Sequence, residues 1–135
     1  MKVVVIDGQG GRLGQLLVEA IRKEGLACDL TVIGTNSIAT ATMLKAGATA
    51  GATGENPVVV ACREADVILG PIGILAADSL LGEVTPAMAT AVGQSRALKL
   101  LLPVSHCNNQ VVGTRPMPLP ELVKEAVARL KDLCK

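Results

Sequence analysis

Aromatic side chains are absent from this sequence of 135 residues, which contains no phenylalanine, tyrosine or tryptophan. A hydrophobic core must therefore be built from Leu, Val, Ile, Ala and Met. Aromatic stacking is also excluded as a way of holding a base. An adenine or nicotinamide ring bound to this chain would lie between aliphatic side chains.

Charge is scarce as well, because only 19% of the residues are charged and the formal net charge is +1. No basic surface for a nucleic acid is indicated. Between residues 36 and 95 the charged residues are Lys45, Glu55, Arg63, Glu64, Asp66, Asp78 and Glu83. This region has more apolar surface than a compact monomer easily buries, so we expect a homodimer or a higher homo-oligomer.

Long hydrophobic runs and paired cysteines are missing too. The longest uncharged apolar segment, residues 67–77, is too short to span a bilayer, and the apolar run at the N-terminus meets Asp7 at once. No C-x-x-C pair occurs among the cysteines, which are Cys28, Cys62, Cys107 and Cys134. These absences predict a cytoplasmic protein with reduced thiols, with no membrane segment, disulfide scaffold or zinc site.

The chain is organised around a short apolar run that stops at glycines. Residues 3–6 are all β-branched, which suits a strand buried on both faces, and a helical pattern begins at Leu13. Gly8, Gly10 and Gly11 let main-chain N–H groups approach a ligand, and the helix start directs its own N–H groups to the same place. We predict a site for the phosphate of a nucleotide here. Gly11→Asp is expected to abolish binding and leave the fold nearly intact.

The glycine spacing restricts the kind of site. The strict dinucleotide pattern G-x-G-x-x-G fails because Leu13 stands where its third glycine is required, whereas Gly8-x-x-Gly11-x-x-Gly14 fits the looser G-x-x-G-x-x-G. A Walker A loop is excluded, since no Gly-Lys-Ser/Thr follows. The alternative is a tight turn between strand and helix that binds nothing.

Strand and helix patterns alternate along the rest of the chain. Further strands are expected at residues 30–33, 48–52, 67–69 and 98–104. This alternation predicts one α/β domain over residues 1–135, with a three-layer Rossmann-like parallel sheet in the strand order 3-2-1-4-5. Val111 and Val112 are candidates for a sixth strand at the edge. Asn56 and Thr85, each followed by proline, are expected to cap two of the helices.

Ligands of such sheets bind beyond the carboxyl ends of the strands. No acidic residue follows the second strand, where one would hold the ribose of NAD. The neutral groups of residues 35–37 would tolerate a 2′-phosphate or a mononucleotide better, unless they only cap the next helix. The predicted cofactor-binding residues are Asp7, Gly8, Gln9, Gly10, Gly11, Arg12, Gly14, Thr35, Asn36, Ser37, Gly70, Pro71 and Gly73.

The conventional catalytic candidates are His106 and Cys107. Neighbours in an extended segment point in opposite directions, so their adjacency argues against a direct dyad and favours a packed cysteine beside a hydrogen-bonded histidine. No spacing predicts a metal site. Three functions therefore stay open, namely a nucleotide-binding sensor or accessory protein, a small enzyme that uses Cys107 or a bound cofactor, and a homo-oligomeric interaction protein with a vestigial turn.

Residues 1–69 resemble the nucleotide-binding part of the NmrA-like and other atypical short-chain dehydrogenases. The resemblance lies in Gly8-x-x-Gly11-x-x-Gly14, in Gly34-Thr35-Asn36, in residues 44–48 and in residues 65–68. It implies NAD(P) as the cofactor, in a family of which several members act as sensors without catalysis. The Tyr-x-x-x-Lys catalytic pair of that family is impossible in a chain without tyrosine.

Asp7 departs from the same pattern, because it stands directly before the first glycine. A carboxylate there would repel a pyrophosphate unless it turns away, caps a backbone group or shares a Mg²⁺ ion. Over its whole length the chain is similar to a small bacterial family catalogued as a domain of unknown function. Residues 5–11, 51–56 and 70–73 carry this similarity, which supports the fold and adds no activity.

Overall fold

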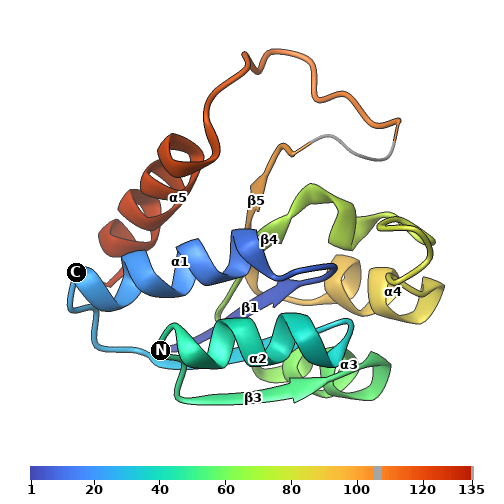
Figure 1. Cartoon of the computed structure of the whole chain (residues 1–135), viewed down its shortest axis with the longest axis horizontal. Helices are drawn as coiled ribbons and strands as arrows, with labels where there is room; N and C mark the ends of the chain where they lie inside the picture. Colours follow the sequence, from blue (N-terminus) through green and yellow to red (C-terminus); the bar gives the residue numbers. More distant parts are fainter. Residues whose placement is uncertain (105–107, 135) are drawn as a thin grey trace.

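The computed structural model describes residues 1–104 and 108–134 and shows a five-stranded parallel sheet with helices on both faces (Figure 1). The strands are β1 (Lys2–Asp7), β2 (Asp29–Gly34), β3 (Ala50–Thr53), β4 (Val67–Pro71) and β5 (Leu98–Leu102). Their order β3-β2-β1-β4-β5 confirms the predicted topology. The α-helices are α1 (Arg12–Lys23), α2 (Ser37–Lys45), α3 (Glu55–Glu64), α4 (Pro86–Gln94) and α5 (Leu119–Leu133), with a short 3₁₀ helix η1 (Ile72–Leu75).

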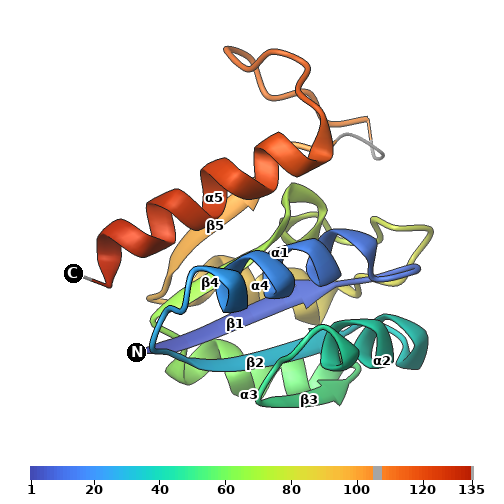
Figure 2. The ribbon, with the colours of Figure 1, turned by 60° about the vertical axis from the view of Figure 1, so that its left-hand side comes forward.

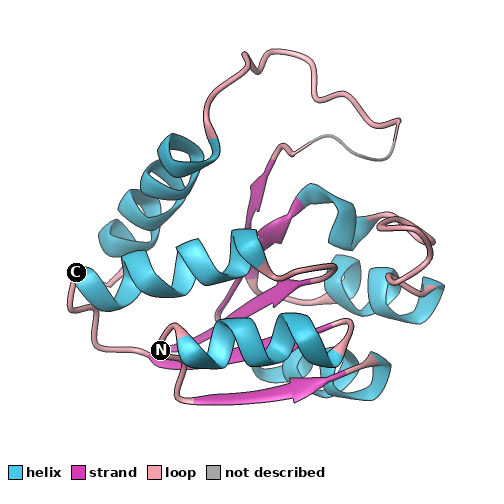
Figure 3. Cartoon of the chain, in the orientation of Figure 1, coloured by secondary structure: helices cyan, strands magenta, loops and turns pink. Residues whose placement is uncertain are grey.

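The predicted sixth strand is wrong. Val111 and Val112 lie in the loop between β5 and α5, drawn pink in Figure 3, and 97% of Val112 is exposed. The Thr114 hydroxyl donates a hydrogen bond of 2.6 Å to the Val111 carbonyl, which closes a turn instead of a strand pair. A turn forms here instead of a strand because Asn109, Gly113 and three prolines surround these two valines.

Strand β1 is the centre of the sheet because its apolar side chains are buried on both faces. Val3 and Val5 belong to one core and Val4 and Ile6 to the other. In the register, Val5 is opposite Val32 of β2 and Leu69 of β4. All strands therefore end at the same edge, where the loops after them meet.

Two helical layers cover the sheet. Helix α1 packs against α2 and α5 on one face, and α3 packs against α4 on the other (Figure 2). The fully buried side chains of Ile21 in α1 and Leu130 in α5 share one core. An exposed ion pair of 3.1 Å between Lys131 and Glu24 adds little to this packing.

Local capping explains where several helices start. The Asn36 side chain accepts a hydrogen bond from the Ala39 N–H at the start of α2, and Thr85 caps α4 as expected. The expected cap at Asn56 is wrong, since α3 starts two residues earlier than expected, at Glu55, and Gly54 takes the N-cap position. Within residues 1–104 and 108–134, no helix has the length and apolar character needed to cross a membrane.

Candidate ligand site at the carboxyl edge of the sheet

The turn between β1 and α1 is built around a backbone hydrogen bond of 2.9 Å from the Gly11 N–H to the Gly8 carbonyl. Gly11 has a φ of 76°, and a Cβ atom on it would lie 2.9 Å from the Ala39 backbone of α2. A side chain at this position would push α1 and α2 apart. The expectation that Gly11→Asp leaves the fold intact is therefore wrong.

Two other glycines of the turn are also required by contacts within the protein. A Cβ atom on Gly8 would lie 2.5 Å from Oγ1 of Thr35, and one on Gly14 would lie 2.3 Å from Sδ of Met43. Gly10 differs, because it is exposed and a Cβ atom on it would meet nothing within 4 Å. Of the glycines in this turn, Gly10 is the one that faces open space.

Asp7 is buried beneath the turn, with 6% of its surface exposed. Its carboxylate accepts hydrogen bonds of 2.8 Å from the Gly8 N–H and 2.7 Å from the Gly14 N–H. Burial raises the pKa of Asp7, the two hydrogen bonds lower it, and the charge of Glu83 raises it further, so that the net shift is upward. Among the roles expected for Asp7, the structure shows that it caps backbone groups of the turn.

Glu83 reaches the same turn from a distant part of the chain. Its Oε1 atom accepts hydrogen bonds from the Gln9 N–H at 2.8 Å, the Thr35 hydroxyl at 2.6 Å and the Asn36 side-chain amide at 2.8 Å. Burial raises the pKa of Glu83, but these hydrogen bonds outweigh it and hold the pKa below its ordinary value. Sequence reasoning missed Glu83, which stands alone among small and apolar residues with no motif around it.

The loop that carries Glu83 has unusual backbone angles. Asp78, Leu80 and Leu81 have φ values of 67°, 56° and 57°, a region that residues other than glycine rarely adopt. The segment is fixed by a hydrogen bond of 2.5 Å from the buried Ser79 hydroxyl to the Gly73 carbonyl. Surrounding contacts therefore hold this loop, and Glu83 with it, against local strain.

The other predicted site residues lie along the same edge in different environments. A Cβ atom on Gly70 would lie 2.4 Å from the Ile6 carbonyl oxygen, so close packing of β4 on β1 requires this glycine. Pro71 and Gly73 are buried, whereas Arg12 and Ser37 are exposed at the starts of α1 and α2. The structure brings these residues to one edge of the sheet, as the topology predicts.

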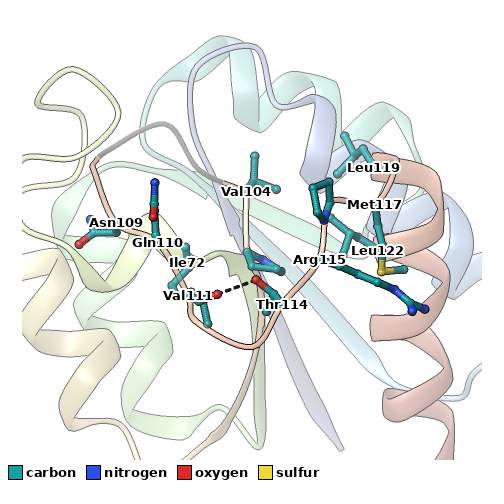
Figure 4. A pocket seen from close by; sticks show the side chains of 12 residues that line it. Ile72, Val104, Asn109, Gln110, Val111, Thr114, Arg115, Met117, Leu119 and Leu122 are labelled. Atoms are coloured by element: carbon teal, nitrogen blue, oxygen red, sulfur yellow. Dashed lines mark hydrogen bonds between the residues drawn. The ribbon is translucent and has the colours of Figure 1, made fainter.

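A cavity of 610 Å³ opens at this edge beyond β5. Figure 4 shows Asn109 and Gln110 on one side of it and the side chains at the start of α5 on the other. Its wall is mostly aliphatic, with Arg115 among the polar residues. The lining residues are Ile72, Pro103, Val104, Asn109, Gln110, Val111, Thr114, Arg115, Pro116, Met117, Leu119 and Leu122. Sequence reasoning did not find this cavity, because residues 108–118 carry no periodic pattern.

The two catalytic candidates, His106 and Cys107, lie outside the described residues. Among residues 1–104 and 108–134, no group of three or more His, Cys, Asp or Glu side chains is placed to hold a metal ion. Burial raises the pKa of the Cys62 thiol to about 11, with the charge of Lys99 opposing the shift. Cys62 is therefore an unreactive core residue.

The parallel sheet, its strand order and the glycine turn at its carboxyl edge define a Rossmann-like α/β protein. The chain matches the family model described as Domain of unknown function (DUF3842) over residues 2–135. It belongs to this family, which confirms the expected whole-length similarity.

Comparison with solved structures finds a dodecameric FMN-dependent UbiX-like decarboxylase from Escherichia coli O157:H7. The two chains share 16% sequence identity with a TM-score of 0.46, and the match covers 98% of this chain and 93% of the other. No curated protein sequence matches this chain.

Proposed function

We propose that residues 1–135 act as a single domain that binds a phosphate-bearing nucleotide at the carboxyl edge of the sheet. The observation that carries this proposal is Gly10, an exposed glycine with open space around it at the start of α1. A phosphate can approach the main chain most closely at a residue with no side chain. The proposed role is that of a sensor or an accessory protein.

The start of α1 supplies the groups that bind the phosphate. The first turn of a helix has N–H groups without intrahelical partners, and the helix dipole adds partial positive charge. The Asp7 carboxylate accepts the hydrogen bond of the Gly14 N–H. The N–H groups of Arg12 and Leu13 have no acceptor within the part of the chain that the structure describes. We propose that these two N–H groups and the exposed Arg12 side chain bind the phosphate oxygens.

The cavity beyond β5 is the proposed place for the ring of the ligand. Its Ile72 directly follows β4, which is the neighbour of β1 in the sheet, and adjacent strands lie about 4.8 Å apart. The lining therefore begins about one strand from β1, at Ile72, and continues beyond β5, which is two strands from β1. Its aliphatic wall suits a ring held without aromatic stacking, and its volume of 610 Å³ lies within the usual range for small-molecule sites.

NAD(P) is the cofactor that the resemblance to atypical short-chain dehydrogenases implies, and the same edge also suits mononucleotides. Thermal unfolding followed by circular dichroism tests these ligands, with NADPH, NADH, ATP and FMN compared side by side. A ligand at a hundred times its Kd adds about 2.7 kcal/mol, which raises the Tm of a domain of this size by several degrees. No shift with any of the four would contradict the proposal.

Gly10→Asp tests where the phosphate binds. A Cβ atom on Gly10 would meet nothing within 4 Å, so Gly10→Asp should retain the fold while its carboxylate occupies the proposed phosphate position and repels the phosphate. The ligand-induced shift in Tm should disappear. The matched control is Gly93→Asp in α4, where an added Cβ atom has an ordinary contact of 3.9 Å with Leu75. Full retention of ligand binding by Gly10→Asp would rule out this position.

A second candidate function, homo-oligomeric association, is favoured by the exposed edge of the sheet. Strand β3 contains neither charge nor proline, the usual protections of an edge strand. Exposed apolar side chains flank it, with Ile38 and Leu44 of α2 and Val60 of α3 exposed by 68%, 39% and 48%. We propose that two copies pair through β3 in a two-fold dimer.

Light scattering after size-exclusion chromatography tests the dimer. Ala50→Lys places a charge on the exposed edge strand and should give a monomer. The control is Val112→Lys, which places the same charge on a fully exposed loop residue. A monomeric parent protein, or an Ala50→Lys variant that stays dimeric, would contradict this assignment.

A further inference from the structure

We infer that Glu83 closes the β2 side of the proposed site and thereby restricts the ligand to a mononucleotide, excluding NAD and NADP. This inference rests on the proposed function, since it concerns the nucleotide that the α1 turn would bind. It is carried by the contacts of Glu83, by the packing of its loop against the turn and by the open space at Gly10.

Glu83 occupies the hydrogen-bonding groups that a dinucleotide would need. In dinucleotide-binding sheets, the end of the second strand meets the adenosine ribose. Here the Thr35 hydroxyl and the Asn36 amide at that strand end both donate to Oε1 of Glu83, at 2.6 and 2.8 Å. The Gln9 N–H of the turn donates to the same oxygen at 2.8 Å. All three donors thus bind one carboxylate oxygen of the protein itself.

The space between the turn and the end of β2 is also filled. A Cβ atom on Gly8 would lie 2.9 Å from both Glu83 Oε1 and Leu80 Cδ1, and Leu80 is 8% exposed. The Asn36 amide donates a second hydrogen bond of 2.9 Å to the Gln9 carbonyl, which ties β2 to the turn. The adenosine half of a dinucleotide would have to displace Leu80 and Glu83 together.

Charge acts in the same direction as packing. The pKa of Glu83 lies below its ordinary value because the hydrogen bonds to its carboxylate outweigh the effect of burial, so the side chain is ionised at neutral pH. A 2′-phosphate placed at the end of β2 would face this negative charge at short range. NADP is therefore excluded more strongly than NAD.

The loop that presents Glu83 is held in place from both ends. The Asp78 N–H donates to the Val84 carbonyl at 2.7 Å, and the Val84 N–H donates to the Ser79 carbonyl at 3.2 Å. The Ser79 hydroxyl donates a hydrogen bond to the Gly73 carbonyl and so anchors the loop to η1. Gly10, by contrast, is exposed with nothing within 4 Å of an added Cβ atom, and the cavity lies beyond β5. A mononucleotide that binds at Gly10 and extends toward this cavity would leave Glu83 in place.

Isothermal titration calorimetry on the full chain tests this inference, with FMN and AMP as mononucleotide probes and NAD⁺ and NADP⁺ as dinucleotides. The parent protein should bind a mononucleotide and bind NADP⁺ at least about tenfold more weakly. Glu83→Ala frees three donors at the end of β2 and in the turn, and it should tighten NADP⁺ binding by about tenfold. Mononucleotide binding should tighten by a smaller factor, because its phosphate gains from the lost charge but does not need the donors at the end of β2. Glu83→Gln keeps the acceptor oxygen and removes the charge, so it should give a smaller gain and serves if Glu83→Ala does not fold.

The matched control is Glu64→Ala, which removes an exposed acidic side chain paired with Lys2 at the start of β1, the opposite end of the strand from the turn. It should leave all four affinities unchanged. Mononucleotide binding together with equally tight NADP⁺ binding by the parent protein, or with no gain in either Glu83 variant, would overturn the role of Glu83 alone. Absence of binding for every probe in every variant would overturn the nucleotide site itself and this inference with it.

Discussion

The Asp7 carboxylate accepts a hydrogen bond of 2.7 Å from the N–H of Gly14, so the residue that ends β1 caps the helix that follows the turn. Gly11, the N-cap residue of α1, has no side chain to serve this purpose. Because the cap comes from the preceding strand, α1 starts without a capping side chain at its own N-cap position. The same carboxylate places a buried titratable group directly beneath the proposed phosphate position.

The contribution of Asp7 to the free energy of unfolding should decrease as the pH rises. Its pKa is raised by burial above the ordinary value of 3.8, so its contribution to stability is complete below that value and is lost as the pH rises through the raised pKa. The stability advantage of the parent protein over Asp7→Asn should therefore be largest at acid pH and shrink toward neutral pH. Thermal melts between pH 3 and pH 8 measure this difference, and an advantage that grows with pH would contradict it.

The contribution of Glu83 to the free energy of unfolding should depend on pH in the opposite way and decrease as the pH falls. Its pKa lies below the ordinary value of 4.5, so its contribution is present above that value and is lost as the pH falls through the lowered pKa. Glu83→Gln should cost about 1 kcal/mol at pH 7, because solvent screens part of the interaction, and almost nothing at strongly acid pH. Urea denaturation at both pH values tests this, and an equal loss at both would refute the charge contribution.

Two glycines of the same turn should respond differently to alanine. Gly14→Ala brings a Cβ atom within 2.3 Å of Sδ of the buried Met43 and should lower stability by about 1–3 kcal/mol. Gly10→Ala meets no atom within 4 Å and should change stability by less than about 0.5 kcal/mol. Thermal melts of the two variants compare them directly. Similar losses in both would show that the whole turn is packed against the protein.

Replacing Leu81 should stabilise the protein. This side chain is 97% exposed, contributes no packing and has a φ of 57°. Asparagine tolerates this backbone region better, so Leu81→Asn should raise stability by about 0.5–1 kcal/mol and the Tm by a few degrees. Val112→Asn, which changes an equally exposed residue outside the left-handed region, is the control and should have no effect. An unchanged Tm for Leu81→Asn would show that the loop is not strained.

The fold could be predicted because its main signals are local and repeated. Buried β-branched runs such as residues 3–6, glycines at turns and alternating helical patterns each indicate the same parallel sheet. The errors fall where local signals conflict. Val111 and Val112 have high strand propensity, but two residues are too short a run to form a sixth strand. The segment around them is also rich in glycine and proline, which disfavour strands.

The candidate site could be predicted only in part. The glycine turn and the polar end of β2 follow from residue spacing, and the topology brings them to one edge. The contact between Glu83 and Gln9 joins residues 74 positions apart and depends on a loop with left-handed residues that no pattern indicates. The role of each glycine was also not predictable, because Gly8, Gly11 and Gly14 are explained by tertiary neighbours that the sequence does not identify.

The packing of α5 on α1 affects how this chain folds during synthesis. Helix α1 leaves the ribosome before α5, and Leu130 of α5, which shares a core with Ile21 of α1, is made more than a hundred residues after it. Until then, the apolar side of α1 around Ile21 stays without its final cover. The nascent chain should therefore be protease-sensitive and a substrate for chaperones until α5 emerges and docks.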